Sequence, residues 1–431
     1  MTNGENSENK SAFSRREVVK IAGGLVAAPA ILRVIPANAQ SAAIKIGFVS
    51  PTTGPIAAFG EADDFILAQV AKVVGPGIAV NGKTYPIQVI AKDCQSSSSR
   101  AAEVASELIL GEKVDLILAA DTPDVTNPVA DQAEANEVPC ITTNCPWQPY
   151  FFGRKGDPKK GFDWTYHFFW GLEDVIAAFT TLWSSVPTNK NVGGLFPNDS
   201  DGNAWGDPEL GFPKPLKAAG YSLLDPGRYQ PLSPDFSAQI AAFKKANVEI
   251  VTGVMIPPDF ATFWSQAAQQ GFKPRIATIG KALLFPSAVS ALGDRGDGLS
   301  SEIWWGPTHP FKSSLTGQSA KELCDAYTAA TGKPWTQPIG FTHSVFEVAI
   351  DVLKRTKNLK DPKSILEAIV ATNLQTVVGP VNWATGPVKN VSKTPLVGGQ
   401  WTKTAKGFDL VICENATAPN IPVGGKLRAL G

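Results

Sequence analysis

Several apolar runs of the chain are followed by loops in which polar side chains stand beside an aromatic ring. Hydroxyl, amide and carboxylate groups can fix the orientation of a small molecule, and flat rings can cover its apolar part. This combination predicts a binding site for a small organic ligand. The candidate ligand-binding residues, in chain order, are Phe59, Thr122, Pro123, Thr143, Asn144, Trp147, Trp205 and Asp259.

The sequence contains no comparable pattern of catalytic residues. The three histidines, His167, His309 and His343, have no zinc-ligand spacing to one another or to a cysteine. A G-x-S-x-G elbow and a phosphate-cradling loop are both missing. Cys145 stands beside Asn144, but nothing near it in the sequence would activate a thiol. We therefore expect no enzyme and no cofactor.

The segment DSDGN at 199–203 matches the start of a calcium-binding loop. The match ends there, because Ala204 stands where the loop needs glycine and Leu210 where it needs glutamate. No metal site is expected. Asp201 is more simply interpreted as a helix cap, or as a residue that orients Trp205.

Short apolar runs alternate with helical periodicity, which implies a parallel, doubly wound sheet. Strands are predicted at 44–50, 86–93, 114–120 and 139–143, and after an irregular segment at 191–197, 249–255 and 275–280. The restart predicts two similar α/β lobes rather than one large sheet. In such sheets the ligand lies beyond the carboxyl ends of the strands, where the candidate residues stand.

Aromatic residues are dense over 147–170. Those inside a predicted strand are interpreted as core, whereas Trp147 and Trp205 stand on strand-end loops and are interpreted as ligand contacts. Trp304-Trp305 adjoin an inter-lobe segment, and whether one of them faces the cleft is open. Stacked rings bind aromatic ligands, and they also cage quaternary ammonium groups. The sequence therefore favours a ligand bulkier or flatter than leucine.

The first 39 residues have the order of an export signal. Arg15-Arg16 precede an apolar stretch at 21–35, and Ala37-Asn38-Ala39 is a cleavage site. The paired arginines indicate the twin-arginine route. Val18-Val19 stand where that signal prefers Phe and Leu, so an ordinary secretory signal stays open, as does a chance pair ahead of a buried helix. The stretch is too short to span a bilayer, and a periplasmic location is expected.

Charge and cysteine usage exclude other classes. The full chain has 39 basic and 39 acidic residues, and the leader is net basic, so the remainder is slightly acidic. This balance gives no electrostatic footprint for nucleic acid or for an anionic membrane. After the leader no apolar run could cross a membrane, so no stable membrane insertion is expected after cleavage. Five cysteines without metal spacing are interpreted as mostly free, buried thiols, with at most one disulfide.

Four segments carry a resemblance to a known family. They are IKIGFVSPTTGPIAAFG, DGNAWGDPELGF, SPDFSAQIAAFKKANVEIVTGV and TVVGPVNW. On these residues the chain resembles the periplasmic substrate-binding proteins of ABC importers, in the branch typified by branched-chain amino-acid (leucine/isoleucine/valine) binding proteins. The resemblance covers nearly all of the chain after the leader.

This resemblance implies a type I periplasmic binding protein fold, with two doubly wound lobes, a ligand cleft and three crossovers near Trp170, Gly280 and Val377. The implied division is 1–39 signal peptide, 40–170 plus 281–376 N-terminal lobe, and 171–280 plus 377–431 C-terminal lobe.

The resemblance also implies a function. The protein would be a monomer that captures an amino acid, an aromatic acid or a related compound and delivers it to an ABC permease in the inner membrane. A sensory ligand-binding protein of the same fold, signalling to a membrane receptor, is the alternative left open.

The resemblance further implies roles for single positions. Phe59 and Trp205 match aromatic residues that face the ligand from the two lobes. Thr143 and Asn144 match the loop that holds a ligand carboxylate. Asp259 falls at or near the acidic residue that pairs with a ligand ammonium.

Two positions depart from the family pattern. A loop usually rich in serine holds Asp121-Thr122-Pro123-Asp124, which adds carboxylates and removes donors. Cys94 matches one half of a family disulfide, but the position of its expected partner holds no cysteine.

Overall fold

The computed structural model describes residues 31–33 and 43–431. The expected signal peptide therefore lies outside the described residues, except for β1 (Ile31–Arg33), which pairs antiparallel with β5 (Ile87–Asp93). Within the described ranges, no helix has the length and apolar character needed to cross a membrane.

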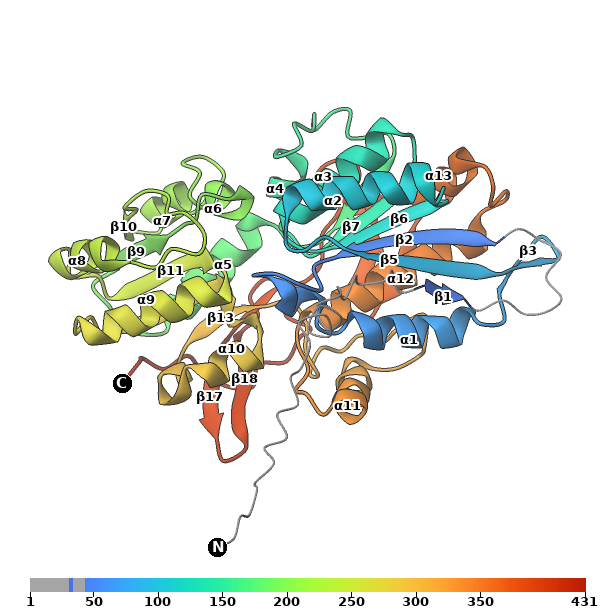
Figure 1. The fold of residues 1–431 in the computed structure, drawn as a ribbon. Helices are drawn as coiled ribbons and strands as arrows, with labels where there is room; N and C mark the ends of the chain where they lie inside the picture. Colours follow the sequence, from blue (N-terminus) through green and yellow to red (C-terminus); the bar gives the residue numbers. More distant parts are fainter. Residues whose placement is uncertain (1–30, 34–42) are drawn as a thin grey trace, which may run out of the picture.

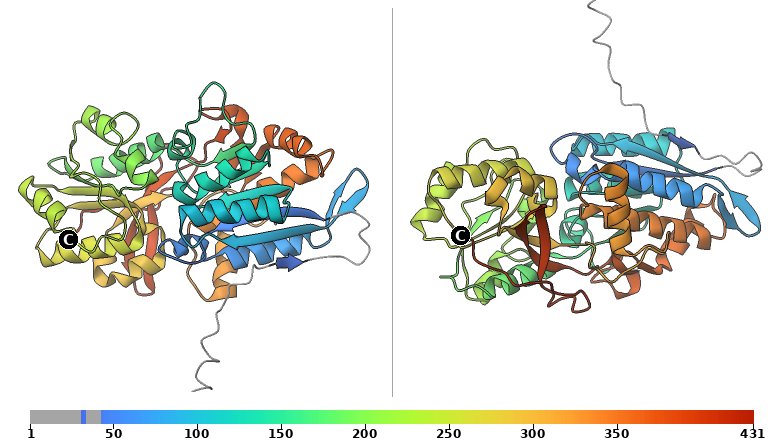
Figure 2. Two further views of the ribbon diagram at one scale, coloured as in Figure 1. Left: turned by 45° about the horizontal axis from the view of Figure 1, so that its top comes forward. Right: turned by 90° about the horizontal axis from the view of Figure 1, so that it is seen from below.

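Two seven-stranded sheets, each covered by helices, form two lobes that lie side by side (Figures 1 and 2). The strand orders are β1-β5-β2-β6-β7-β8-β16 and β10-β9-β11-β12-β13-β17-β18. The remaining strands of the first sheet are β2 (Ile44–Ser50), β6 (Leu116–Ala120), β7 (Cys140–Thr143), β8 (Thr165–Phe168) and β16 (Val391–Ser392). Those of the second are β9 (Asn191–Leu195), β10 (Ser222–Leu224), β11 (Ile250–Met255), β12 (Ile276–Lys281), β13 (Ser300–Ile303), β17 (Val397–Thr404) and β18 (Gly407–Glu414).

The sheets are parallel except at one edge of each. β1 is antiparallel to β5, and β17 and β18 close the second sheet in antiparallel order. Two small antiparallel pairs accompany the first lobe: β3 (Ile78–Val80) with β4 (Lys83–Tyr85), and β14 (Asn373–Thr376) with β15 (Gly379–Asn382). The doubly wound α/β architecture expected from the sequence is confirmed.

Helices cover both faces of each sheet, with α1 and α12 below the first sheet and α2 and α3 above it in Figure 1. The first lobe holds η2 (Ala57–Gly60), α1 (Asp63–Val74), α2 (Ser98–Ser106), η3 (Glu107–Gly111), α3 (Pro123–Ala135), α4 (Trp147–Phe151), α11 (Ala320–Thr331), α12 (Pro338–Arg355), α13 (Pro362–Val370) and η6 (Trp383–Thr385). The second holds α5 (Leu172–Ser184), α6 (Ser200–Trp205), α7 (Pro213–Ala218), α8 (Ser237–Lys245), α9 (Pro257–Gln269), η4 (Ala282–Leu284), α10 (Pro286–Ala291) and η5 (Gly293–Gly296).

Local signals in the sequence explain where these elements begin and end. Every residue of β6 is buried, as a parallel strand covered on both faces requires. Proline opens α3, α9 and α12, where its missing N–H costs nothing. The Ser97 hydroxyl accepts the Arg100 backbone N–H and caps α2. Gly271, with a φ of 65°, follows the end of α9.

The chain passes between the lobes three times, at 169–171, 304–305 and 393–396. We call 43–170 with 305–393 the first lobe, and 171–304 with 394–431 the second lobe.

The second and third passages differ from the expected positions near Gly280 and Val377. β13 pairs with β12, so 281–303 completes the second sheet rather than joining the first lobe. β16 pairs with β8, so 377–392 stays with the first lobe. Pairing between strands far apart in the chain decides both boundaries, and such pairing leaves no local mark in the sequence.

Candidate ligand-binding site

A cavity of about 20 Å³, here called the cleft cavity, lies between the two lobes. Its lining comes from both lobes and from two of the passages between them: Phe59, Thr122, Asn144, Pro146, Trp170, Asp201, Trp205, Val254, Lys281, Glu302 and Trp304. A space of this size holds about one water molecule. A larger ligand therefore enters only when the lobes separate.

Four of the predicted site residues line the cleft cavity. Phe59 lies in η2 after β2, Thr122 stands directly before α3 after β6, and Asn144 follows β7. Trp205 ends α6 in the second lobe and faces them across the cleft. The carboxyl ends of parallel strands thus bring these four side chains together.

Two predicted residues lie directly behind this lining. Pro123 opens α3 next to Thr122, and it fixes the backbone there rather than facing the cavity. The Thr143 hydroxyl donates a 2.7 Å hydrogen bond to the Phe168 carbonyl and is fully buried. Thr143 therefore joins β7 to β8.

Trp147 lies at the hinge rather than in the cavity lining. Its indole N–H donates to Glu173 at 3.2 Å, and the Gln148 amide donates to the same carboxylate. The Lys393 ammonium contacts Glu173 at 2.7 Å and Asp174 at 2.8 Å. These five residues, here called the hinge network, connect the first passage between the lobes to the third.

Asp259 is buried in the first turn of α9, and the cavity lining does not include it. Burial raises the pKa of its carboxyl to about 6. Neither carboxylate oxygen makes a hydrogen bond of normal geometry among the described residues, although the backbone N–H groups of Leu232 and Ser233 lie near it and oppose the shift. Its expected role as partner of a ligand ammonium would require a contact beyond the present lining.

A buried charge cluster forms the second-lobe wall. The Lys281 ammonium lies 2.5 Å from Asp201 Oδ2 and 3.6 Å from Asp199 Oδ2. Burial acts to lower the pKa of Lys281, but Asp199 and Asp201 outweigh it, so its pKa is raised and the amine stays charged. Burial raises the pKa of Asp201, and Lys281 opposes that shift. A lysine buried in this way depends on its carboxylate partners.

Glu302 adds a second acidic group to the same wall. Its carboxylate accepts the Lys281 backbone N–H at 3.0 Å and the Ser301 hydroxyl at 2.9 Å. Burial raises the pKa of Glu302 to about 7, against the effect of these hydrogen bonds. The carboxyl therefore titrates close to neutral pH.

Two lining residues have a left-handed backbone. The φ angle is 74° at Asn144 and 65° at Lys281. Asparagine tolerates this region better than most residues, whereas lysine has no such preference. Backbone strain of this kind gathers at ligand-binding positions, and here it aims two polar side chains at one cavity.

Aromatic rings form the remaining walls. Trp304 lies 6.1 Å from Phe59 and 6.1 Å from Trp170 between ring centroids, and Trp205 stacks on Phe212 at 5.0 Å. The indole N–H groups of Trp170, Trp205 and Trp304 are buried, and none makes a hydrogen bond of normal geometry among the described residues, although the Trp304 indole lies near the Glu302 carboxylate. Three donors without a normal hydrogen bond beside a cavity are a stronger indication of a ligand than the rings alone.

The sequence left open whether Trp304 or Trp305 faces the cleft. In the structure Trp304 lines the cleft cavity. Trp305 instead packs beneath Gly340 and donates to the Val377 carbonyl at 3.0 Å.

The predicted site residues do not include Lys281 and Glu302, although both line the cleft cavity. Lys281 ends β12 directly after the predicted strand end at 280, so the strand-end rule could have found it. Glu302 lies in the polar strand β13, which has no apolar signal.

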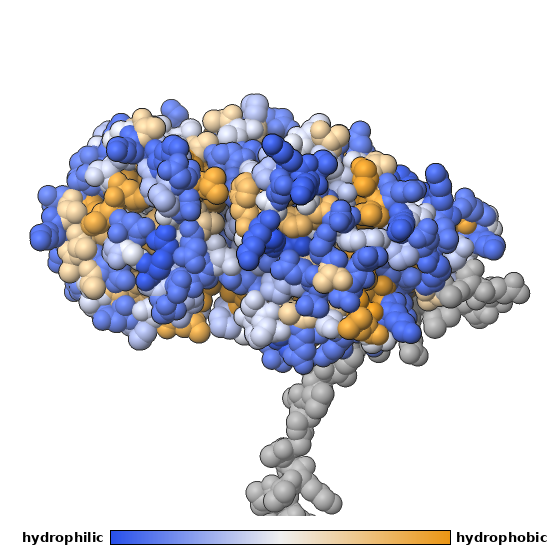
Figure 3. All heavy atoms as spheres, turned by 90° about the horizontal axis from the view of Figure 1, so that it is seen from above, coloured by the Kyte–Doolittle hydropathy of each residue, from blue (hydrophilic) through white to orange (hydrophobic). Residues whose placement is uncertain are grey.

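The lobes touch at the mouth of the cleft. The Ser200 hydroxyl at the start of α6 donates a 2.5 Å hydrogen bond to Asp124 at the start of α3. Seen from above, side chains of the two lobes meet along their boundary (Figure 3). The structure is therefore a closed arrangement of the lobes.

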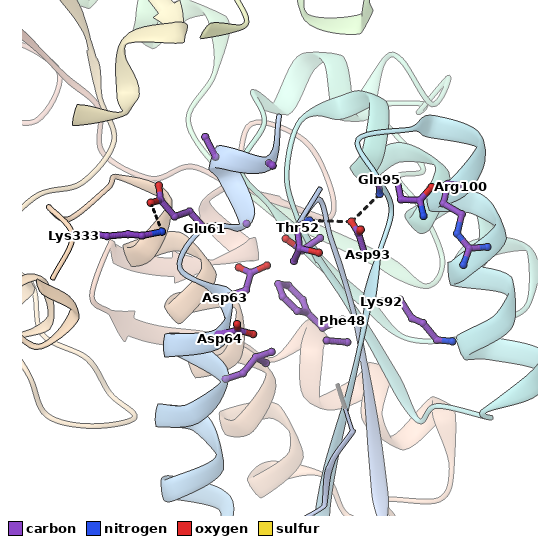
Figure 4. A pocket seen from close by; sticks show the side chains of 16 residues that line it. Phe48, Thr52, Glu61, Asp63, Asp64, Lys92, Asp93, Gln95, Arg100 and Lys333 are labelled. Carbon is purple, nitrogen blue, oxygen red and sulfur yellow. Dashed lines mark hydrogen bonds and ion pairs between the residues drawn. The ribbon is translucent and has the colours of Figure 1, made fainter. Parts of the chain in front are cut away.

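A much larger pocket, here called the first-lobe pocket, shares η2 with the cleft cavity but is lined by the first lobe alone (Figure 4). It has a volume of about 620 Å³ and opens between α1, the ends of β2 and β5, and the start of α2. Most of its charged groups are already paired. Lys333 contacts Glu61 at 3.0 Å, Lys92 contacts Glu107 at 3.0 Å, and Asp93 accepts the backbone N–H of Thr52 at 3.0 Å.

Asp63 is the buried exception in the first-lobe pocket. It is 3% exposed, and its Oδ2 makes no hydrogen bond of normal geometry among the described residues, although the Ser50 hydroxyl lies near it. Burial raises the pKa of its carboxyl to about 7.

Cys145 and His167 lie close together without forming a nucleophilic pair. Their Sγ and Nε2 atoms are 3.9 Å apart, and the His167 ring stacks on Tyr150 at 4.1 Å. Burial lowers the pKa of His167 to about 3 and raises that of Cys145, so both groups stay neutral. A neutral thiol with no basic partner is a poor nucleophile. All five cysteines are free, and no cluster of three or more metal-ligating side chains occurs among the described residues.

The family model described as periplasmic binding protein matches residues 43–405. Among solved structures, the chain is similar to a leucine-binding protein from Thermotoga maritima. The two are 20% identical with a TM-score of 0.68, over 87% of this chain and 99% of the other.

Two further similar structures come from Rhodopseudomonas palustris. One is an ABC-transporter solute-binding protein in complex with 3,4-dihydroxybenzoic acid, 19% identical with a TM-score of 0.70, over 86% of this chain and 96% of the other. The second, in complex with 4-hydroxybenzoate, is 16% identical with a TM-score of 0.71, over 90% and 98%. At these identities the likeness is one of fold.

Proposed function

Because the chain belongs to the periplasmic binding protein family, we propose that it is the solute-binding component of an ABC importer. In this role it captures a small organic molecule in the periplasm and hands it to a permease in the inner membrane. One observation carries the proposal. The lining of the cleft cavity comes from both lobes and from two of the passages between them, so a ligand there contacts each part that moves.

The lining of the cleft cavity and the similar solved structures define the range of ligands that we propose. Solved structures with this fold include proteins that bind leucine and hydroxybenzoates. We take amino acids, aromatic acids and related compounds as the range for this chain. Three indoles with unused N–H donors support a ligand that offers both a flat or bulky face and hydrogen-bond acceptors.

The mechanism is a shift of population between open and closed arrangements. A ligand that contacts both lobes stabilises the closed one. Moving the balance from mostly open to mostly closed takes a difference in binding free energy of about 5.5 kcal/mol. Trp205 and Asp201 from the second lobe and Phe59, Thr122 and Asn144 from the first are the side chains placed to supply it.

A thermal-shift screen of amino acids, aromatic acids and betaines should find the ligand. A compound at about 100 times its Kd adds about 2.7 kcal/mol to the free energy of unfolding. If no compound of these classes stabilises the protein, the proposed function is wrong.

The ligand found in this way allows a test of the site. Replacing Trp205 with alanine should weaken binding by about tenfold or more, measured by calorimetry, because the ring closes the second-lobe wall. Trp264→Ala is the matched control, since Trp264 belongs to the same lobe but donates to the Arg295 carbonyl away from the cavity. Equal affinities of wild type and Trp205→Ala would remove Trp205 from the site.

A further inference from the structure

The aromatic walls of the cleft cavity converge from four separate segments. Phe59 comes from η2, Trp170 and Trp304 from the passages between the lobes, and Trp205 from α6. Each of these side chains is 3% exposed or less. Rings gathered around a desolvated space can hold a positive charge where they present a π face to it.

The charges in the lining also favour a positively charged ligand. The lining contains two carboxyl groups, Asp201 and Glu302, and Lys281 is its only positively charged residue within the described part of the chain. Lys281 is already held by Asp201 and Asp199. A ligand carboxylate would therefore find no free cation in the lining and would lie beside acidic groups.

The hydrogen-bond acceptors in the lining distinguish between a primary ammonium group and a methylated one. A primary ammonium needs three acceptors. Among the described residues, the lining offers it two buried unpartnered acceptor atoms, Asn144 Oδ1 and Asp201 Oδ1, so its third donor would have to share an acceptor that is already occupied. A methylated nitrogen needs none, and it gains from ring faces instead. The unused indole N–H groups would then serve oxygen atoms elsewhere on the same ligand.

We propose that the ligand carries a quaternary ammonium group, which the aromatic walls receive beside Asp201, together with an oxygen function that accepts from the indole N–H groups. This inference rests on the proposed function, because it concerns the same cleft. The cavity has room for about one water, so in the closed, ligand-bound form the lobes lie somewhat farther apart than they do here.

Isosteric pairs test the charge directly on the chain without its leader. Choline and 3,3-dimethylbutan-1-ol differ only in the replacement of the positive nitrogen by carbon, and so do glycine betaine and 3,3-dimethylbutanoate. At least one nitrogen compound should bind about tenfold or more tightly than its carbon isostere by calorimetry. Carbon isosteres that bind equally well, or no binding of either nitrogen compound, would overturn the proposal.

A wider screen separates this inference from the proposed function. If leucine or 4-hydroxybenzoate binds and the quaternary compounds do not, the solute-binding function stands and the inference is wrong. If no compound of any class binds, both are wrong.

Variants locate the charge preference. Asp201→Asn should bring the nitrogen compound and its carbon isostere close to equal affinity, whereas Asp294→Asn, an exposed carboxylate of the same lobe, should keep the difference. If Asp201→Asn does not fold, Trp304→Leu should reduce the difference in the same direction. Trp383→Leu is its control, because Trp383 packs on Tyr166 away from the cleft. A full preference in the folded Asp201→Asn or in Trp304→Leu would contradict the assignment.

Discussion

The cleft cavity and the first-lobe pocket differ in volume by more than an order of magnitude, about 20 Å³ against about 620 Å³. The larger pocket belongs to one lobe, and most of its charged groups already have partners. The smaller one draws on both lobes and holds a strained lysine, two carboxyl groups and three indole N–H groups that make no hydrogen bond of normal geometry to the described part of the chain. In a protein that closes around its ligand, unused groups converging from separate bodies identify the site better than empty space does.

Removing the charge of Lys281 should have the largest effect in this comparison. Lys281→Met leaves Asp199 and Asp201 without their buried counter-charge. The free energy of unfolding, measured by urea denaturation, should fall by about 3–5 kcal/mol. A variant as stable as the wild-type protein would show that the buried cluster is not held together by this lysine.

Replacing Asp63 should reveal a burial cost in the first-lobe pocket. Its pKa of about 7 in the folded protein exceeds the ordinary value of 3.8, so the stability it contributes is complete below about pH 4 and is lost as the pH rises to about 7. Asp63→Asn carries no charge and avoids this loss. The variant should therefore be more stable than the wild-type protein at pH 8, by up to about 4 kcal/mol, and nearly equal to it at pH 4.

Thermal unfolding across this pH range measures the difference. Asp64→Asn is the control: this side chain is exposed and is the smallest contributor to the raised pKa of Asp63, so its gain should be much smaller. Glu302 and Asp259 titrate in the same direction in both proteins, so their contributions cancel. If Asp63→Asn abolished ligand binding instead, the ranking of the two pockets would have to be reversed.

The smallest effect is expected at the rim of the first-lobe pocket. Lys333 pairs with Glu61, and the two side chains are 56% and 22% exposed. Lys333→Met should change the free energy of unfolding by less than about 1 kcal/mol, because water screens an exposed pair. The same substitution thus serves as the matched control for Lys281→Met, and a loss comparable to that variant would mean the rim is structural.

Much of the fold could be predicted from the sequence. The strand expected at 44–50 has those bounds in the structure, and apolar runs located most of the parallel strands because both faces of those strands are buried. β13 and β16 were not predictable in this way. One is polar and the other has two residues, so only their neighbours in the sheet define them. The misplaced passages between the lobes follow from these two strands.

Part of the candidate site could be predicted from the rule that ligands bind beyond the carboxyl ends of parallel strands. Phe59, Thr122, Asn144 and Trp205 line the cavity as that rule requires. Trp147 stands on a similar loop, but α4 turns it toward Glu173 and the hinge. Nothing in the local sequence distinguishes the two tryptophans, because the difference lies in the direction of a short helix.

The last three strands also set the order in which the two sheets can be completed. The first sheet needs β16 at 391–392, and the second needs β17 and β18 at 397–414. A ribosome makes the chain from its N-terminus, so neither lobe can finish folding until these late residues have been made. The nascent protein therefore remains an unfinished pair of sheets until then. An export machinery that needs an unfolded chain could bind the nascent protein throughout the time before β18 is made. One that needs a folded chain could act only after β18 has joined its sheet.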